Sequence, residues 1–312
     1  MKEYILSYYP NFKCIANNCK HTCCAGWDMY IDKKTLNDYK NEKSTFSTTL
    51  QKGIDFKKSK FMSDKFKRCA FLNGDGLCEI IKNLGENSLC QICRDHPRFR
   101  SFFEIGEEIG LGFCCEEATR IILSYKEKIV PILAKCDSDN AKLSFIQEQV
   151  LRFRTQIIDA IQDRSLPISA RIDNILNLCK AKVSENDFSK ILKKFTTFEK
   201  LDKTWGSRLK AVKRNNTPLD KGEDLSIYCE QFLVNSFYRH VAQAEDTIWA
   251  RAIALACVFS WWIIRHVYQN EKSNETALET LCDIVRDFSS EVEYSQKNVQ
   301  NLFSFACKFV VI

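Results

Sequence analysis

The sequence predicts a mostly α-helical protein in which a cysteine-rich, loop-rich, metal-binding N-terminal part packs on a C-terminal helical bundle. Ten of the 16 cysteines and eight of the ten glycines lie within residues 1–125. Beyond residue 126 glycine is rare, and apolar residues recur at helical spacing. We therefore expect two regions: a cysteine-rich metal- or cluster-binding region over 1–125 and a helical region over 126–312.

Composition narrows the classes of protein that fit. A chain of 312 residues with 45% hydrophobic content can bury one large core or two moderate ones. Its net charge of +6 suits an acidic or polar protein partner but is too weak to indicate nucleic acid. The longest apolar run, 248–264, is shorter than the roughly 20 residues that span a membrane, and it contains Arg251. It predicts a buried helix and no membrane partner, and the absence of a signal peptide predicts a cytoplasmic protein without disulfides.

The first cysteine block is Cys14-x4-Cys19-x3-Cys23-Cys24. Thiolates two to four residues apart let one loop present several ligands to a single metal centre. Adjacent cysteine side chains point in different directions. We therefore expect either one of Cys23 and Cys24 on the metal and the other packed, or two centres. The alternative is that these are buried structural cysteines, since free cysteine is often fully buried.

Two further blocks follow. The Asn-Gly-Asp-Gly sequence at 73–76 predicts a turn that brings Cys69 and Cys78 together at the two ends of a hairpin. Cys90-x2-Cys93 alone is weak evidence, because the same spacing occurs in redox pairs. A thioredoxin-like function would need a βαβ context, which this part of the sequence lacks.

The fourth block, Cys114-Cys115, stands where a helix is expected to start. Thiolates near the positive end of a helix would be stabilised electrostatically. From the four blocks together, the predicted metal ligands are a subset of Cys14, Cys19, Cys23, Cys24, Cys69, Cys78, Cys93 and Cys114. The spacing does not separate zinc from an iron–sulfur cluster: His21 and His96 inside the array favour zinc, and the excess of thiols favours iron.

The second region predicts a series of helices. Apolar periodicity from Ala277 to Phe288 predicts a helix there, with Ser273 as its N-cap, and Pro167, Pro218 and a turn at 215–217 separate other helices. These are expected over 141–163, 168–182, 186–201, 224–243, 246–269 and 296–308. The remaining cysteines are expected to be small apolar residues of these helices; they are Cys136, Cys179, Cys229, Cys257, Cys282 and Cys307.

The four cysteine blocks, taken with their neighbours, resemble a known family. The start from Cys14 to Trp27, the 68–72 block (Arg-Cys-Ala-Phe-Leu) with Cys78, the 90–98 block (Cys-Gln-Ile-Cys-Arg-Asp-His-Pro-Arg) and the 114–120 block (Cys-Cys-Glu-Glu-Ala-Thr-Arg) are similar to the flagellin lysine-N-methylases, within the wider CxxCxxCC group of zinc- or iron-chelating proteins. The resemblance covers residues 10–122. The family commonly has proline at the positions of Ala70 and Cys115, and the second difference leaves open whether Cys114 or Cys115 is the ligand.

The resemblance implies an enzyme that transfers methyl groups from S-adenosylmethionine to the ε-amines of flagellin lysines, with a [4Fe–4S] cluster held by the cysteines. The residues themselves support the metal but carry no independent sign of methyl transfer. Most methyltransferases bind the cofactor on a glycine-rich turn after a parallel strand, and no such turn is present in the sequence. The cofactor is therefore expected at or near the cluster.

A lysine methylase must accept a proton from its amine substrate and hold its cofactor. Glu116 is the candidate base, with a solvated position in the first turn of a helix as the alternative. Arg94, Arg98 and Arg120 are candidates for holding the cofactor's carboxylate, or else for structural salt bridges. Trp27 is a candidate for stacking on the adenine, or else a core tryptophan.

A rival interpretation is a non-enzymatic zinc- or iron-binding protein with an interaction or redox role. A zinc-bound interaction module would be colourless and have no affinity for S-adenosylmethionine. A cluster carrier or redox sensor would contain iron without transferring methyl groups.

Overall fold

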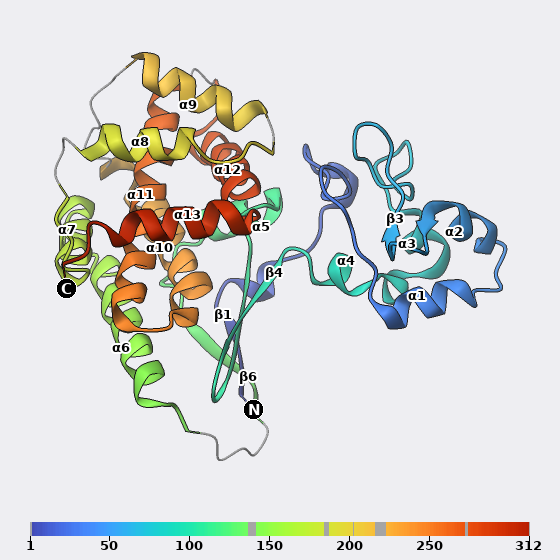
Figure 1. The fold of residues 1–312 in the computed structure, drawn as a ribbon, viewed down its shortest axis with the longest axis horizontal. Helices are drawn as coiled ribbons and strands as arrows, with labels where there is room; N and C mark the ends of the chain where they lie inside the picture. Colours follow the sequence, from blue (N-terminus) through green and yellow to red (C-terminus); the bar gives the residue numbers. More distant parts are fainter. Residues whose placement is uncertain are drawn as a thin grey trace. The chain divides into compact units, whose positions relative to one another are not determined.

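The computed structural model describes residues 2–136, 142–183, 187–201, 203–215, 223–271 and 274–311. These residues are mostly helical, as predicted. They form two compact units (Figure 1). The helical unit comprises Met1–Phe12 together with Phe99–Ile312, and the cysteine unit comprises Lys13–Arg98. These limits differ from the expected regions 1–125 and 126–312, because both the N-terminal segment and residues 99–125 belong to the helical unit.

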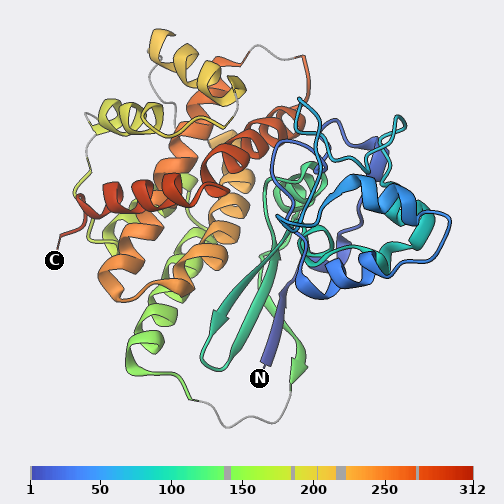
Figure 2. The same cartoon turned by 45° about the vertical axis from the view of Figure 1, so that its right-hand side comes forward.

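A four-stranded sheet accounts for this difference. Its order is β4 (Arg98–Phe103), β5 (Gly106–Leu111), β1 (Lys2–Leu6) and β6 (Pro131–Cys136), and Figure 2 shows these strands running side by side. β1 pairs in parallel with β5, so that Lys2 lies opposite Gly106, and in antiparallel with β6. A Cβ at Gly106 would lie 2.2 Å from the carbonyl oxygen of Lys2, so this close approach of strands requires glycine. The sequence analysis did not predict the sheet.

Helices make up the rest of the helical unit. Their bounds are α5 Glu116–Ser124, α6 Phe145–Ile161, α7 Ile168–Leu178, α8 Phe188–Thr196, α9 Lys203–Asn215, α10 Ser226–His240, α11 Thr247–Asn270, α12 Ala277–Phe288 and α13 Gln296–Cys307, with a π-helical turn, η7, at Ser289–Glu293. The predicted helices are confirmed, and α9 was missed. The N-cap of α12 is Thr276, which forms a capping box with Glu279. Ser273 was therefore the wrong choice of cap and lies, like Pro218 and most of the 215–217 turn, outside the described residues.

α11 is the central helix of this unit. It is buried along most of its length and packs against α9, α10, α12 and α13, which confirms the expected buried helix. Within the described residues it is the one helix long and apolar enough to cross a membrane, and 72% of its most apolar window is buried inside the protein. Such burial is typical of the core helix of a globular protein.

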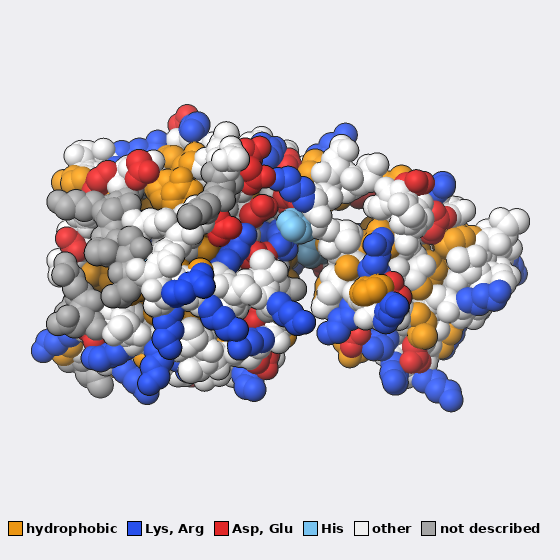
Figure 3. Space-filling model, turned by 90° about the horizontal axis from the view of Figure 1, so that it is seen from above, with side chains coloured by type: hydrophobic (Ala, Val, Ile, Leu, Met, Phe, Trp, Pro, Cys, Tyr) orange, Lys and Arg blue, Asp and Glu red, His pale blue; other side chains and the backbone are white. Residues whose placement is uncertain are grey.

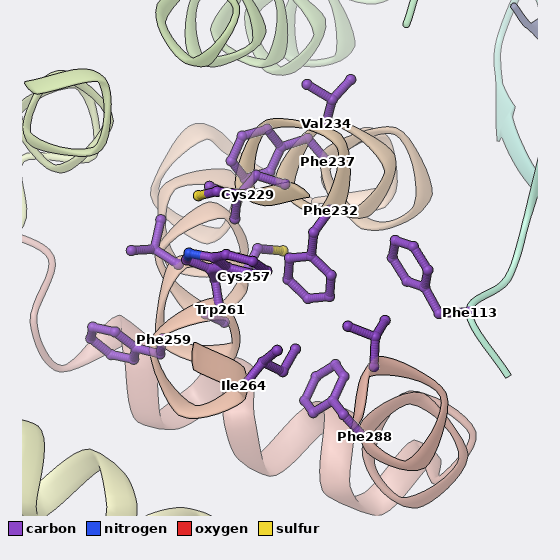
Figure 4. Close-up of a cluster of buried hydrophobic side chains, with 14 of the residues drawn as sticks. Phe113, Cys229, Phe232, Val234, Phe237, Cys257, Phe259, Trp261, Ile264 and Phe288 are labelled. Atoms are coloured by element: carbon purple, nitrogen blue, oxygen red, sulfur yellow. The ribbon is translucent and has the colours of Figure 1, made fainter. Parts of the chain in front are cut away.

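The cysteines outside the array mostly fill this helical core. Figure 4 shows Cys229 and Cys257 among Phe232, Phe237 and Trp261. These two, with Cys179 and Cys282, are buried, and Cys307 ends α13. Cys136 is the exception: it lies exposed at the end of strand β6, so its expected place on a helix was wrong.

The cysteine unit has short elements joined by loops, as expected. Its elements are α1 Lys33–Lys40, α2 Ser47–Gly53, β2 Ile54–Asp55, β3 Lys60–Phe61, α3 Glu79–Leu84 and α4 Gln91–Asp95. A small aromatic core lies between them, in which Phe71 contacts Phe46 and Phe61 at centroid distances of 6.1 and 5.2 Å. The core also includes Cys69 and Cys90.

Candidate metal centre

The two units divide the cysteine array between them. Eight thiols belong to the cysteine unit: Cys14, Cys19, Cys23, Cys24, Cys69, Cys78, Cys90 and Cys93. Cys114 and Cys115 belong to the helical unit, at the residues that precede α5. All ten are free thiols, with no disulfide among them.

Five thiols line the core of the cysteine unit. Cys69 and Cys90 are buried in it, and Cys24, Cys78 and Cys93 pack against it. Burial raises the pKa of Cys69 to about 12, and the nearby charges of Cys24, Cys78 and Cys90 add to the increase. Burial likewise raises the pKa of Cys78. A metal cation bound next to Cys69 and Cys78 would offset the free-energy cost of burying their negatively charged thiolates.

Hydrogen bonds link four of the thiols in pairs. In the first pair the thiol of Cys23 bonds Cys24 and lowers the pKa of Cys24 to about 7. In the second, the thiol of Cys93 bonds Cys90 and lowers the pKa of Cys90, while the pKa of Cys93 rises because it holds the shared proton. One member of each pair is thus stabilised as a thiolate, which is the form that binds metal.

The predicted turn at 73–76 is confirmed, but the residue opposite Cys78 is Leu72, whereas Cys69 pairs with Ser63. Leu72 pairs with Cys78 across the turn, and the amide of Asn73 donates to the carbonyl of Leu77 at 2.9 Å. The side-chain oxygen of Asn73 accepts from the amides of Asp75 and Leu77, which fixes the turn. The amide of Cys69 donates to the carbonyl of Cys24 at 2.8 Å, so the first and second cysteine blocks are neighbours.

The remaining thiols of the first block are more exposed. Cys14 and Cys19 flank a short 3-10 turn, Ala16–Asn18, and Cys14 and Cys23 are exposed. Asn17 of this turn lies beside Gly76 of the hairpin, where an added Cβ would be 3.5 Å away. This loop therefore packs against the turn at 73–76.

The thiols suit a thiophilic metal, but they are not arranged around one common metal position. Among the described residues, no three histidine, cysteine or carboxylate side chains lie close enough together to hold a metal ion. The two hydrogen-bonded thiol pairs, the buried Cys69 and the half-buried Cys78 nevertheless supply soft ligands of the kind that zinc and iron–sulfur clusters take. The assignment of ligands within the predicted set stays a prediction.

Cys114 differs from its expected state. Burial raises its pKa to about 12, although a hydrogen bond with Tyr294 and the charge of Arg239 act in the opposite direction. The expectation that the start of α5 stabilises a Cys114 thiolate was wrong, because desolvation outweighs the field of the helix end. Cys115 is the N-cap of α5.

Glu116 and Arg120 both lie on α5 in the helical unit. Glu116 is the first residue of this helix, as predicted. Arg120 makes a two-point salt bridge to Glu117 at 2.7 and 2.6 Å. This pairing is the structural alternative that the sequence analysis left open for Arg120.

Trp27, Arg94 and Arg98 lie in the cysteine unit. The indole of Trp27 donates to the carbonyl of Cys23 at 2.9 Å and packs against the small core. Arg98 donates to the carbonyl of Arg94 at 3.1 Å. The predicted cofactor-binding residues therefore belong to different units, with Arg120 on one and these three on the other.

Sequence reasoning gave too little weight to His96. Its ring stacks on Trp27 at a centroid distance of 6.3 Å, and its Nε2 atom is buried without a hydrogen-bond partner in the described structure. Burial lowers the pKa of His96 to about 4, so its imidazole is neutral at pH 7. Its position three residues after Cys93, at the end of α4, was the signal available in the sequence.

Comparison with known proteins gives three relatives, all from Salmonella. Proteins named lysine-N-methylase from Salmonella choleraesuis and Salmonella typhimurium are each 29% identical over 135 residues, which is 40% of this chain and 34% of theirs. A flagellar biosynthetic protein FliU from Salmonella muenchen is 30% identical over 135 residues, which is 40% of this chain and 80% of that protein. The chain thus matches about a third of the length of the lysine-N-methylases. No protein-family model and no solved structure matches it.

Proposed function

The chain belongs to the protein family of the flagellar biosynthetic protein FliU, and we propose that it is an S-adenosylmethionine-dependent protein-lysine N-methyltransferase that modifies flagellin. The observation that carries this proposal is the similarity to two proteins named lysine-N-methylase. Flagellin as the substrate is supported by the flagellar name of the third relative and by the resemblance of the cysteine blocks.

The reaction is a direct transfer. The lone pair of a neutral lysine Nζ attacks the methyl carbon of S-adenosylmethionine, the carbon–sulfur bond breaks, and its electrons return to sulfur as S-adenosylhomocysteine leaves. The amine must lose one proton for each methyl gained. In our proposal Glu116 accepts that proton, because it is a carboxylate at the start of α5, directly after Cys114 and Cys115.

The metal in this proposal is a [4Fe–4S] cluster, with zinc as the alternative. The cysteine-unit thiols of the predicted set would hold it, and it would supply Lewis-acid binding of the cofactor's amino-carboxylate. Arg94 and Arg98 would then hold the carboxylate by charge-assisted hydrogen bonds, and Trp27 would stack on the adenine. Arg120 is the weaker candidate, because Glu117 already engages its guanidinium.

Mass spectrometry of flagellin tests the function. Flagellin incubated with the metal-loaded protein and S-adenosylmethionine should gain about 14 Da per methyl on its lysines. Cys93→Ser should abolish the gain, and Cys257→Ser, a change in the helical core, is the matched control. Flagellin from cells lacking the gene should be lighter at the same lysines. Identical lysine masses with and without the gene would overturn the methylase proposal.

A non-enzymatic metal protein is the second candidate. The lack of a glycine-rich cofactor turn and the array of free thiols favour it. The colour of anaerobically purified protein distinguishes the two metals. An iron–sulfur cluster gives a brown solution that absorbs broadly in the visible range, whereas zinc gives a colourless solution. Absence of S-adenosylmethionine binding to the loaded protein would favour this second candidate.

A further inference from the structure

The positive charge of the protein is concentrated in the cysteine unit. Residues 13–98 contain 16 lysines and arginines against 10 aspartates and glutamates, whereas the rest of the chain contains 30 of each. The whole net charge of +6 therefore belongs to this unit. Figure 3 shows lysine and arginine side chains among hydrophobic ones on one face of it.

One turn of this unit combines exposed cations with exposed apolar side chains. All seven residues of Met62–Arg68 are exposed, and we call them the cationic turn. The side chain of Phe66 is 69% exposed and that of Met62 is 45% exposed. Within the described structure no salt bridge engages Lys65, Lys67 or Arg68, and the ammonium of Lys65 lies over the Phe66 ring, 5.0 Å from its centroid. An exposed aromatic side chain among cations that no acid neutralises is typical of an interaction site.

Hydrogen bonds hold the cationic turn in one conformation. One carboxylate oxygen of Asp64 accepts from the amides of Phe66 and Arg68 at 2.8 and 2.9 Å. The amide of Lys67 donates to the carbonyl of Asp64 at 2.9 Å, and the amide of Asp64 donates to the carbonyl of Arg68 at 3.0 Å. The single acid of the turn is thus engaged with its backbone, so the turn has little backbone entropy left to lose on binding.

The cationic turn is anchored beside the candidate metal centre. The amide of Gly26 donates to the carbonyl of Lys67 at 3.1 Å, and Ala25 pairs with Arg68. The next residue, Cys69, bonds the backbone of Cys24. A protein bound to the turn would therefore lie against the first and second cysteine blocks.

We propose that the cationic turn is the docking site for an acidic segment of the protein substrate, with an apolar side chain of that segment packed on Phe66. This inference rests on the proposed function and adds the kind of sequence that the enzyme selects. Lys65, Lys67 and Arg68 repel a substrate lysine, so a lysine approaches this surface only with carboxylates near it that offset the repulsion. The fixed backbone of the turn sets the starting positions of its side chains. This favours a protein partner, which is recognised by the positions of side chains.

Charge reversal tests the site. Lys65→Glu with Lys67→Glu reverses the charge of two of the three cations, and Phe66→Ser removes the apolar contact. The matched control, Lys33→Glu with Lys34→Glu, makes the same charge change at exposed positions of α1 in the same unit. The probe is a glutamate-rich peptide with one leucine and one lysine, and its binding to the metal-loaded protein is measured by fluorescence anisotropy at several salt concentrations. Unchanged metal content shows that each variant is folded.

The charge reversal should weaken peptide binding by about tenfold or more and should make the affinity less dependent on salt. Phe66→Ser should weaken peptide binding at all salt concentrations. The control variant should change the affinity by less than about twofold. With flagellin as substrate, KM should rise while kcat stays the same. Equal binding by the reversal and control variants would overturn the proposal. The proposal would also be overturned if the protein bound single-stranded DNA or phosphatidylserine vesicles more tightly than the peptide and lost that binding on charge reversal. A wild-type protein that binds the peptide but methylates nothing would overturn only the methylase function.

Discussion

Replacing Phe71 with alanine should make the folding of the cysteine unit depend on its metal. Phe71 is 1% exposed and contacts Phe46 and Phe61. It also fills the space above Gly53, where an added Cβ would lie 2.3 Å from Cζ of the ring. Alanine at this position would leave a cavity between Phe46, Phe61 and Gly53. Such a change in a packed core costs about 3–5 kcal/mol.

That cost is large for a unit of this size. Folding free energies of roughly 0.05–0.15 kcal/mol per residue give about 4–13 kcal/mol for residues 13–98. Metal bound by thiolates contributes on the order of 10 kcal/mol in small domains. Near the low end of this range the loss of about 3–5 kcal/mol removes most of the stability of the metal-free unit, so the metal-free Phe71→Ala variant should unfold far more often than the metal-free wild type, whereas the metal-loaded variant should stay folded.

Limited proteolysis measures the difference. Trypsin should cut between Lys57 and Arg68, where lysines are exposed, much faster in the metal-free variant than in the metal-free wild type. Loading with metal should restore resistance. Phe237→Ala is the control: it removes a ring of the same size that is 0% exposed in the helical unit, so it should leave cutting at these sites unchanged. Equal cutting rates for the two metal-free proteins, or no protection by metal, would refute the reasoning.

Two further predictions concern the thiols and a buried acid. Cys69→Ser should lower the bound metal measured by elemental analysis, and Cys257→Ser, within the helical core, should leave it unchanged; equal losses would contradict the predicted ligand set. Burial opposes ionisation of Glu293, but Arg239 and His240 outweigh it and lower its pKa to about 2. Because this pKa lies below the roughly 4.3 of an unfolded glutamate, ionised Glu293 stabilises the fold above pH 4.3, and that stabilisation is lost as the pH falls towards 2. Glu293→Gln should therefore cost about 3 kcal/mol in denaturant unfolding at pH 7 and much less near pH 2; a cost that does not depend on pH would contradict the lowered pKa.

The local pattern of the sequence was enough for most helices and for one hairpin. Apolar residues at helical spacing predicted seven helices, because each of these helices is buried on one face or on all sides. They are α6, α7, α8, α10, α11, α12 and α13. The Asn-Gly-Asp-Gly sequence predicted the turn at 73–76, because asparagine and glycine favour its backbone conformation, but the bridge across this turn joins Cys78 to Leu72 and not to Cys69. The missed helix, α9, has lysines and arginines spread along it that hide its narrow apolar face of Trp205, Leu209 and Val212.

The sheet and the limits of the two units could not be predicted in the same way. β1 and β5 pair although about 100 residues separate them, and neither is long enough to give a periodic signal of its own. Their pairing places residues 99–125 in the helical unit, and with them Cys114, Glu116 and Arg120.

For the candidate site, the sequence by itself determined the chemistry, and the tertiary structure decided the environment of each group. Cysteine count and spacing identify soft metal ligands because thiolates are rare and specific donors. Only the fold shows which thiols line a core, which share a proton, and that burial raises the pKa of Cys114. Such properties depend on desolvation and on charges brought together from distant parts of the chain, which spacing along the sequence does not record.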